Sequence, residues 1–430
     1  MNRDELEKLN REELVEAYLS LQNRLKRPAK TSRTSSKPPS TDRKAKREGS
    51  KPGGAKPGHK GHARQLCENP DQTTDHRPDR CGDCGHVFCA DARGAVIGEY
   101  DAIDLPAIVP VTKRHRRLVC TCPDCGTQTK AAVPEAASGS PFGPNIRALA
   151  FYLKHLQHVS YQRLEAMFHD VFGLKISQGA LGNILRRGGV AFEAKKTGIR
   201  AVLRQAEAVA SDETGVRIEG VNGYQWVFRA PGVVLHEASF SRGAQVVRDV
   251  MDGHRPRFWT SDRYSAQQNH AEHHQTCLAH LARDSARVLE VGDEKIGLRL
   301  KLWMNDAFAL ARGMGDAAAS TIARKQRDLE DRIGSILCET TSCEETRAVL
   351  QKVNNARDQL LTFIDAPGLV EPTNNSCERA LRPSVINRKV TNGFRAEWAA
   401  KTDAAIRSVV DTASLSGANP YRTIHQTLST

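Results

Sequence analysis

The sequence lacks several features, and each absence excludes a class of protein. No run of about 18 apolar residues occurs in the 430 residues, so no transmembrane helix is predicted and no membrane partner is expected. The first residues, MNRDELEK, contain no apolar segment of the kind found in secretory signal peptides. Aromatic residues make up only 5% of an otherwise ordinary globular composition. We therefore expect a cytoplasmic protein whose 11 cysteines are mostly reduced.

Acidic residues are nearly missing from one segment, Arg24–Arg64, which holds 14 basic and two acidic side chains. This segment alone carries +12 of the chain's formal net charge of +13. It is rich in Pro, Gly, Ser and Lys, a composition that cannot bury enough apolar surface to fold. We predict that residues 27–66 form a disordered basic arm. The arm either contacts DNA or RNA phosphates without sequence preference or serves as a solvated linker.

The residues before the arm have the spacing of a short coiled coil. Leu14, Tyr18, Leu21 and Leu25 follow one another at intervals of four, three and four residues. We predict a leucine-zipper-like helix over residues 1–26. It associates with a second copy of the chain or packs on the chain's own body.

Two cysteine motifs predict a metal site. Each has two cysteines separated by two residues and followed by glycine, and together they supply Cys81, Cys84, Cys122 and Cys125. Four thiolates are the ligands that structural Zn²⁺ prefers, so we predict a zinc-binding domain over residues 67–135. Three apolar stretches in this region are candidate strands for a hairpin: Ala95–Ile97, Ile108–Val111 and Leu118–Val119.

Residues 140–200 have the pattern of a helical DNA-binding region. Ser160 is a plausible N-cap of a helix that Gly173 ends, and Ser177 is a plausible N-cap of the next helix. Two helices joined in this way predict a helix-turn-helix unit. The polar residues that it would present to base edges or phosphates are Gln178, Asn183, Arg186 and Arg187. The alternative is an ordinary layer of a helical bundle.

Residues 201–412 change from helical periodicity to short strands. We expect strands at Glu207–Thr214, Val216–Ile218 and Tyr224–Phe228, with a type I′ turn at Asn222-Gly223. Then follow a strand at Val233–Phe240, a helix at Gly243–Met251 and a strand at Arg257–Thr260. This order is the beginning of a ribonuclease-H-like fold, in which the first and fourth strands are neighbours. A helical insertion is expected at about residues 290–365, and a tail over residues 413–430.

Three carboxylates in this region are candidates for chemistry. Asp212 lies near the end of the first predicted strand, and Asp262 directly follows the fourth. Glu378 lies about one turn into a helix that Thr373 or Asn374 caps. Oxygen ligands of this kind hold Mg²⁺ or Mn²⁺, and paired ions activate phosphodiester cleavage. Basic residues around the third carboxylate suit a DNA backbone, notably Arg379, Arg388 and Lys389.

The expected fold class is multidomain α+β: a coiled-coil helix, a zinc-ribbon-like domain, a helix-turn-helix region and a ribonuclease-H-like core with a helical insertion. The whole sequence resembles the DDE transposases of the insertion-sequence-66 family. The matching motifs are the two cysteine pairs, VSYQRLEAMFHDVFGLKISQGAL, Ser211-Asp212-Glu213-Thr214, Ser261-Asp262, Cys277-Leu278-Ala279-His280 and NNSCERALRP. Two positions depart from the family's pattern. Arg263 stands where glycine is usual, and the family tends to have an aromatic residue at Gln267 or Gln268.

The resemblance implies that Asp212, Asp262 and Glu378 form a catalytic triad that binds magnesium. It implies a DNA transposase that binds the terminal inverted repeats of an insertion sequence, cleaves one strand and transfers the 3′-hydroxyl into target DNA. The expected partners are DNA ends, target DNA, further copies of the chain and accessory proteins of the same element. Two alternatives stay open: a nuclease of the same fold without strand transfer, and a noncatalytic DNA-binding regulator.

Overall fold

The computed structural model describes residues 10–15, 18, 29–35, 42, 54–55, 58–61, 64–133 and 140–429. Most of the predicted zipper helix, including Leu21 and Leu25, and most of the basic arm lie outside these residues. The chain divides into two compact units, which are Lys44–Val111 and the combination of Met1–Arg43 with Thr112–Thr430. Within the described ranges, no helix has both the length and the apolar character that a bilayer crossing requires.

The strands predicted between the cysteine motifs are only partly correct. Ala95–Ile97 and Ile108–Val111 form no strand, and their large apolar side chains are exposed, so these stretches have no buried face to pair. Strands form instead on either side of the second motif. They are β1 (Val119–Thr121) and β2 (Gln128–Lys130), which pair antiparallel with Cys120 opposite Thr129.

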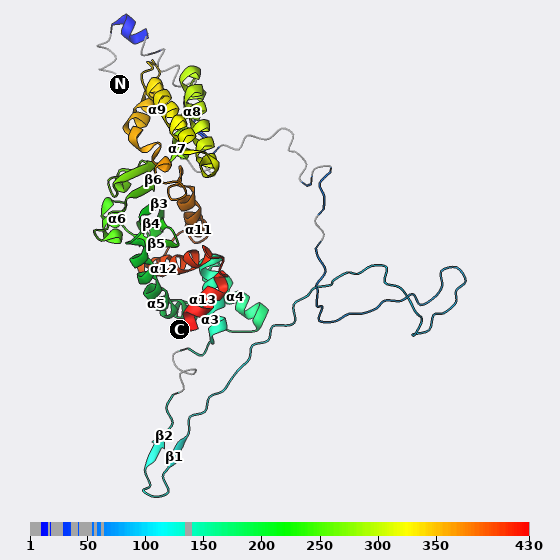
Figure 1. Ribbon diagram of the computed structural model, residues 1–430. Coiled ribbons are helices and arrows are strands. Elements are labelled where there is room, and N and C mark those ends of the chain that lie inside the picture. The colour runs from blue at the N-terminus through cyan, green and yellow to red at the C-terminus, as the bar shows by residue number, and fades with distance from the viewer. Residues whose placement is uncertain are drawn as a thin grey trace. The chain divides into compact units, whose positions relative to one another are not determined.

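A five-stranded mixed sheet forms the centre of the larger unit (Figure 1). Its spatial order is β5-β4-β3-β6-β7. The strands are β3 (Ala208–Ile218), β4 (Val221–Ala230), β5 (Val233–Ser239), β6 (Phe258–Ser261) and β7 (His273–Thr276). The first three are antiparallel, whereas β6 runs parallel to β3 and β7 runs parallel to β6. The expected adjacency of the first and fourth strands is therefore confirmed, while β7 had no prediction.

The first hairpin differs from the prediction. β3 continues unbroken through Asp212 to Ile218, and the turn lies at Glu219-Gly220, where both residues have positive φ, 54° and 80°. Positive φ at both central positions is what a type I′ turn requires. The predicted turn at Asn222-Gly223 is wrong, because Gly223 lies inside β4 opposite Val216. A Cβ at Gly223 would lie 2.6 Å from the side chain of Ile218, so close packing explains this glycine.

Helices cover both faces of the sheet, and alternate residues of the strands face each of them. Helix α11 (Asn375–Thr391) covers one face, where Cys377 and Leu381 pack on Val227 and Val234. The other face packs against α6 (Ala244–Met251) and the C-terminal end of α5 (Gln178–Leu203). Every second side chain of β3, beginning with Ala210, therefore lies on the sheet face that α11 covers.

A second helical layer follows β7 and encloses its own core around the buried Trp303 (Figure 1). Its helices are α7 (Leu278–Glu290), α8 (Glu294–Gly313), α9 (Ala319–Leu337) and α10 (Glu344–Asn355). Single turns of 3₁₀ helix occur at Ser265–Gln267, Met314–Asp316, Arg357–Gln359 and Thr362–Ile364. Leu278 and Leu281 join this core to Ala208 and Phe258 of the sheet. The layer thus returns the chain to the sheet face on which α11 lies.

The helical region before the sheet has the predicted caps. Ser160 accepts a hydrogen bond from the Arg163 N–H, Gly173 is left-handed, and Ser177 accepts from the Ala180 N–H. These residues bound α4 (Tyr161–Phe172) and begin α5, which runs for 26 residues. Before them lie α3 (Pro144–Phe151) and a π-helical turn at Tyr152–Leu156.

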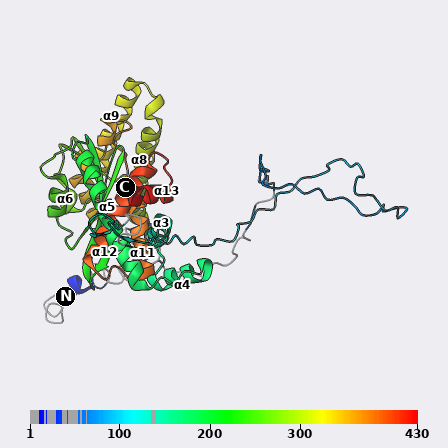
Figure 2. The same cartoon turned by 90° about the horizontal axis from the view of Figure 1, so that it is seen from below.

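The C-terminal helices complete the core of that helical region. They are α12 (Glu397–Ser414) and α13 (Pro420–Ser429), which pack on α5 and α3 respectively (Figure 2). Ala405, Ile406 and Ile424 are buried there beside Phe151 and Phe192. The helix-turn-helix candidate and the end of the chain therefore share one hydrophobic core.

A buried ionic cluster lies at this junction. The Asp403 carboxylate is 2.9 Å from both His155 Nδ1 and Arg407 Nε, and Arg407 also donates to the His155 carbonyl. Burial alone would raise the pKa of Asp403, but the Arg407 charge and the His155 hydrogen bond outweigh it and lower the pKa. Each buried charge in this cluster thus has a partner of opposite sign.

Candidate active site

Asp212 lies in the middle of β3, opposite Val227 of β4, on the sheet face that α11 covers. Its Oδ1 accepts a hydrogen bond of 2.9 Å from the Glu213 N–H. Burial raises the pKa of Asp212 well above its usual value, and the negative charges of Glu213, Asp262 and Glu378 raise it further. The half-buried Asp212 carboxylate therefore has neighbouring charges of its own sign.

Asp262 follows β6 directly and lies beside Asp212 because of the strand register. Ala210 and Thr260 are register partners in β3 and β6, and each precedes one of the two aspartates by two residues. Asp262 Oδ1 accepts a hydrogen bond of 2.8 Å from the Tyr264 N–H, which fixes the start of the following loop. The two aspartates thus come from neighbouring parallel strands.

Glu378 lies in the first turn of α11, where two side chains of α7 hold it. The distance from His280 Nε2 to Glu378 Oε1 is 3.2 Å, and the Arg283 guanidinium is 3.9 Å from Oε2. The His280 hydrogen bond lowers the pKa of Glu378 against the opposing effect of burial, and the Arg283 charge adds to the lowering. Glu378 is therefore ionised and reaches toward α7.

Asn374 joins the elements that carry the three carboxylates. Its side chain is only 2% exposed and donates from Nδ2 to the Ser211 carbonyl over 2.7 Å, next to Asp212. Its backbone N–H donates to the sulfur of Cys277, and its carbonyl accepts from the Glu378 N–H. The predicted capping position is correct, but the side chain binds β3 instead of capping α11. No sequence pattern indicates this bridge.

A polar network behind Asp212 was also missed by sequence reasoning. Glu213 points to the other side of β3, where Arg242 forms an ion pair with it at 2.8 Å. Gln267 is fully buried, donates to Glu213 and accepts from the Ser211 hydroxyl. Burial raises the pKa of Glu213 even though Arg242 opposes the shift. The glutamine at a position where an aromatic residue was expected is therefore a hydrogen-bonding bridge.

Arg263, the other departure from the family's pattern, contacts α7. Its guanidinium lies 2.6 Å from the Asp284 carboxylate of α7. The large side chain therefore ties the loop after Asp262 to the helical layer.

The predicted DNA-binding residues fall into two groups. On α5, Gln178, Asn183, Arg186 and Arg187 are all exposed. Gln178 donates to Glu165 of α4, and the Arg186 guanidinium lies 5.9 Å from the centre of the Trp398 ring. On α11, Arg379 and Lys389 are exposed, but Arg388 donates to the Gly215 carbonyl of β3.

The two cysteine motifs have the same local geometry. The Cys81 N–H donates to the His86 carbonyl and the Cys122 N–H donates to the Thr127 carbonyl, over 2.8 and 2.9 Å. The glycines that follow have φ of 73° and 71° and donate back to the first cysteine of each motif. Hydrogen bonds from backbone N–H groups of Cys84 and Asp83 lower the pKa of Cys81. Each turn thus favours a thiolate.

No group of three or more His, Cys, Asp or Glu side chains within the described part of the chain has a geometry that would hold a metal ion. The donor chemistry at the sheet nevertheless suits a divalent cation. The groups that raise the pKa of Asp212 are all carboxylates, so their mutual repulsion is what a bound cation would relieve.

Comparisons with known proteins agree with the motifs. An uncharacterized protein of Sinorhizobium fredii, y4qI, is 23% identical over 386 residues, which cover 79% of this chain and 70% of that protein. Residues 139–402, more than half of the chain, match the family described as "Transposase IS66 family". This range contains the whole sheet, α11 and all three carboxylates. The chain belongs to the IS66 transposase family.

Proposed function

We propose that the chain is a DNA transposase that binds the inverted-repeat ends of an insertion sequence, cleaves DNA with divalent metal ions and joins the 3′-hydroxyl to target DNA. One observation carries the proposal: Asp212, Asp262 and Glu378 come from two parallel strands and one helix, and the charges of the other two raise the pKa of Asp212. The strand order, in which the first and fourth strands are neighbours, supports the ribonuclease-H-like fold that we propose. Family membership supports the reaction class.

The three carboxylates fit Mg²⁺ or Mn²⁺, because such ions prefer oxygen ligands that are ionised. Asp212, Asp262 and Glu378 would hold the ions. When bound, two divalent ions supply activation of the attacking oxygen and stabilisation of the leaving oxygen. The chain's own residues keep these ligands in place: Asn374 ties α11 to β3, and His280 keeps Glu378 ionised.

DNA recognition is proposed for separate parts of the chain. The exposed face of α5, with Gln178, Asn183, Arg186 and Arg187, suits base edges and phosphates. Arg379 and Lys389 on α11 suit the backbone near the carboxylates, whereas the proposed role of Arg388 changes to bracing β3. The arm would add salt-sensitive affinity.

We also propose Zn²⁺ as a structural ion bound by Cys81, Cys84, Cys122 and Cys125. The support is the matching hydrogen-bond pattern of each motif taken by itself and the thiolate-favouring turn. Self-association, through the leucine-rich helix, and accessory proteins of the same element complete the proposed partners.

Cleavage of a DNA fragment that carries the ends of the encoding element tests the function. Purified wild type should nick these ends in the presence of Mg²⁺, and Glu378→Gln should not. A strand-transfer assay with pre-cut ends separates a transposase from a nuclease of the same fold. Metal-independent binding without any cleavage would instead identify a regulator and contradict the proposal.

A further inference from the structure

A cavity of about 250 Å³ lies near two of the carboxylates, Asp212 and Asp262. Its lining includes Ala210 and Thr260, which precede these aspartates by two residues each. On β3 and β6, residues two apart face the same side of the sheet, so the cavity adjoins the aspartates on the face beneath α11. Any group in this cavity therefore lies next to the proposed reaction site.

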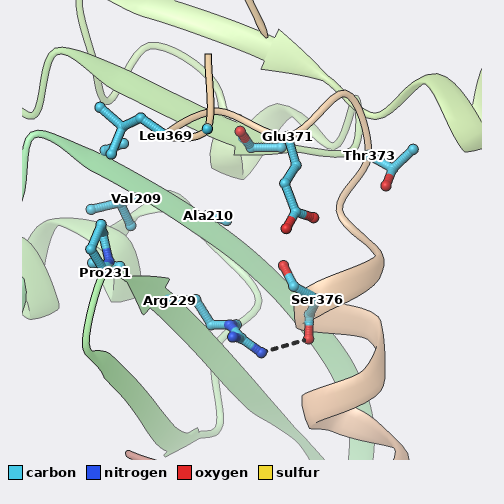
Figure 3. Close-up of a pocket in the computed structure, with 12 residues that line it drawn as sticks. Val209, Ala210, Arg229, Pro231, Leu369, Glu371, Thr373 and Ser376 are labelled. Carbon is cyan, nitrogen blue, oxygen red and sulfur yellow. Dashed lines mark hydrogen bonds between the residues drawn. The ribbon is translucent and has the colours of Figure 1, made fainter. Parts of the chain in front are cut away.

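The two sides of the cavity differ in chemistry. Figure 3 shows Val209, Pro231 and Leu369 on one side. Arg229 and Glu371 lie on the other side, where the Arg229 guanidinium donates to the Ser376 carbonyl over 3.3 Å. Within the described residues, the Glu371 carboxylate has neither a hydrogen bond nor an ion pair. The cavity thus combines an apolar wall with one cationic donor group and one unpaired anionic acceptor.

This combination selects against some ligands. A phosphate group would meet the Glu371 carboxylate, and like charges repel. A drug-sized molecule is too large, because pockets for such ligands range from roughly 300 to 1,000 Å³. A planar heterocycle with an acceptor edge, a donor edge and an apolar face matches these walls.

We propose that the cavity receives one unstacked guanine of the DNA strand whose phosphate lies at the carboxylates. Guanine presents O6 and N7 to an arginine and an amino group to a carboxylate. Arg229 would donate to the first pair, Glu371 would accept from the amino group, and Pro231 and Leu369 would cover one face of the ring. Extrusion of a base into a fitted pocket is an established way for enzymes to read a nucleotide. The inference rests on the proposed function and adds a base-specific contact to it.

Inosine lacks the amino group of guanine but is otherwise the same. Replacing guanine by inosine therefore removes only the group that would contact Glu371. Full-length protein is offered element-end DNA in which each guanine near the cleavage site is replaced in turn. At one position, inosine should lower the cleavage rate by wild type about tenfold, which corresponds to about 1.4 kcal/mol. Glu371→Ala removes the acceptor, so it should cut normal DNA about tenfold more slowly and show no further loss with inosine. The matched control Glu272→Ala, at an exposed glutamate that does not line the cavity, should behave as wild type.

Binding in Ca²⁺ gives a second measurement that does not depend on cleavage. Fluorescence anisotropy should show weaker binding of the same inosine-substituted DNA by wild type, and 2-aminopurine at that position should brighten when it unstacks. If no guanine position is sensitive to inosine in either assay, the inference is wrong. The proposed function still stands in that case, provided that wild type cleaves and Glu378→Gln does not.

Discussion

Two aspartates in this protein have opposite electrostatic surroundings. Asp403 on α12 contacts Arg407 and His155, and its pKa is lowered. Asp212 on β3 has Glu213, Asp262 and Glu378 as its charged neighbours, and its pKa is raised. Asp403 is buried and Asp212 is half-buried, and for both the loss of hydration raises the pKa. The neighbouring charges decide the direction of the net shift.

The difference separates a structural charge from the charge that we propose to be functional. A buried ion pair with all its partners stabilises the arrangement of the elements that carry it, here α12 and the π-helical turn. A carboxylate that is held among other carboxylates costs stability, and clusters of this kind are typical of functional sites. The proposed metal ion would offset this repulsion.

The largest expected effect is on catalysis. Asp212→Asn removes an ionised oxygen ligand without changing the size of the side chain, so cleavage should fall about a thousandfold or more. Asp403→Asn should leave the cleavage rate of the folded protein within about twofold. A metal-dependent nicking assay on element-end DNA measures both. Equal losses in the two variants would erase the distinction.

The second effect is on stability, where the larger change is expected at Asp403 and not at Asp212. Asp403→Asn leaves Arg407 buried without its charge partner, which should lower the free energy of unfolding by about 3–5 kcal/mol. Urea denaturation measures this change. The control is Asp170→Asn, since the Asp170–His169 pair is largely exposed and should contribute about 0–1 kcal/mol. A small loss in Asp403→Asn would show that the cluster does not stabilise the fold.

A smaller effect is expected at Asn374, which holds the Asp212 region by neutral hydrogen bonds. Asn374→Ala should lower the free energy of unfolding by about 1–3 kcal/mol, because the Ser211 carbonyl loses its buried donor. It should also raise the Mg²⁺ concentration that gives half-maximal cleavage. Asn375→Ala, at the neighbouring residue, is the matched control. An unchanged Mg²⁺ requirement would make Asn374 purely structural.

The smallest effect is a difference in pH dependence without metal. The pKa of Asp212 is raised in the folded protein, whereas the same carboxyl in the unfolded chain loses its proton near pH 3.9. The folded protein therefore holds one proton more than the unfolded chain above that pH. For this reason the free energy of unfolding decreases as the pH rises through the raised pKa. Asp403 has the opposite sign, and its contribution is lost as pH falls below about 3.9. In EDTA, urea unfolding from pH 5 to 8 should show a flatter profile for Asp212→Asn. Parallel profiles would contradict the assignment.

Local signals in the sequence predicted much of the fold. The caps at Ser160, Gly173 and Ser177 are correct because each depends on one side chain or one backbone conformation. The predicted position of the hairpin turn was wrong because Gly223 packs closely against Ile218 of the partner strand, a contact that the local sequence does not show. The short strand β7 has no alternating pattern, since His273 and His274 begin it and buried polar residues end it.

The candidate site was predictable only where local sequence patterns mark its residues. Asp262 lies at a strand end and Glu378 at a helix start, which are positions that sequence patterns mark. The hydrogen bonds of Asn374 to Ser211, Gln267 to Ser211 and His280 to Glu378 join residues that are 163, 56 and 98 positions apart in the chain. Contacts of this kind depend on tertiary packing, and no local pattern specifies them.

The shared core of α5 and α12 also has a consequence for how the protein is made. Phe192 and Ile406 pack together but are separated by most of the sheet and the whole helical layer. At about 5–20 residues per second, a ribosome needs roughly 10–40 s to synthesise the chain between them. During that interval the helices before the sheet lack part of their apolar core, and Glu378 is made only near its end. A chain that terminates before Glu378 has neither the complete helical core nor the third carboxylate of the proposed site, so we expect it to have none of the proposed activity.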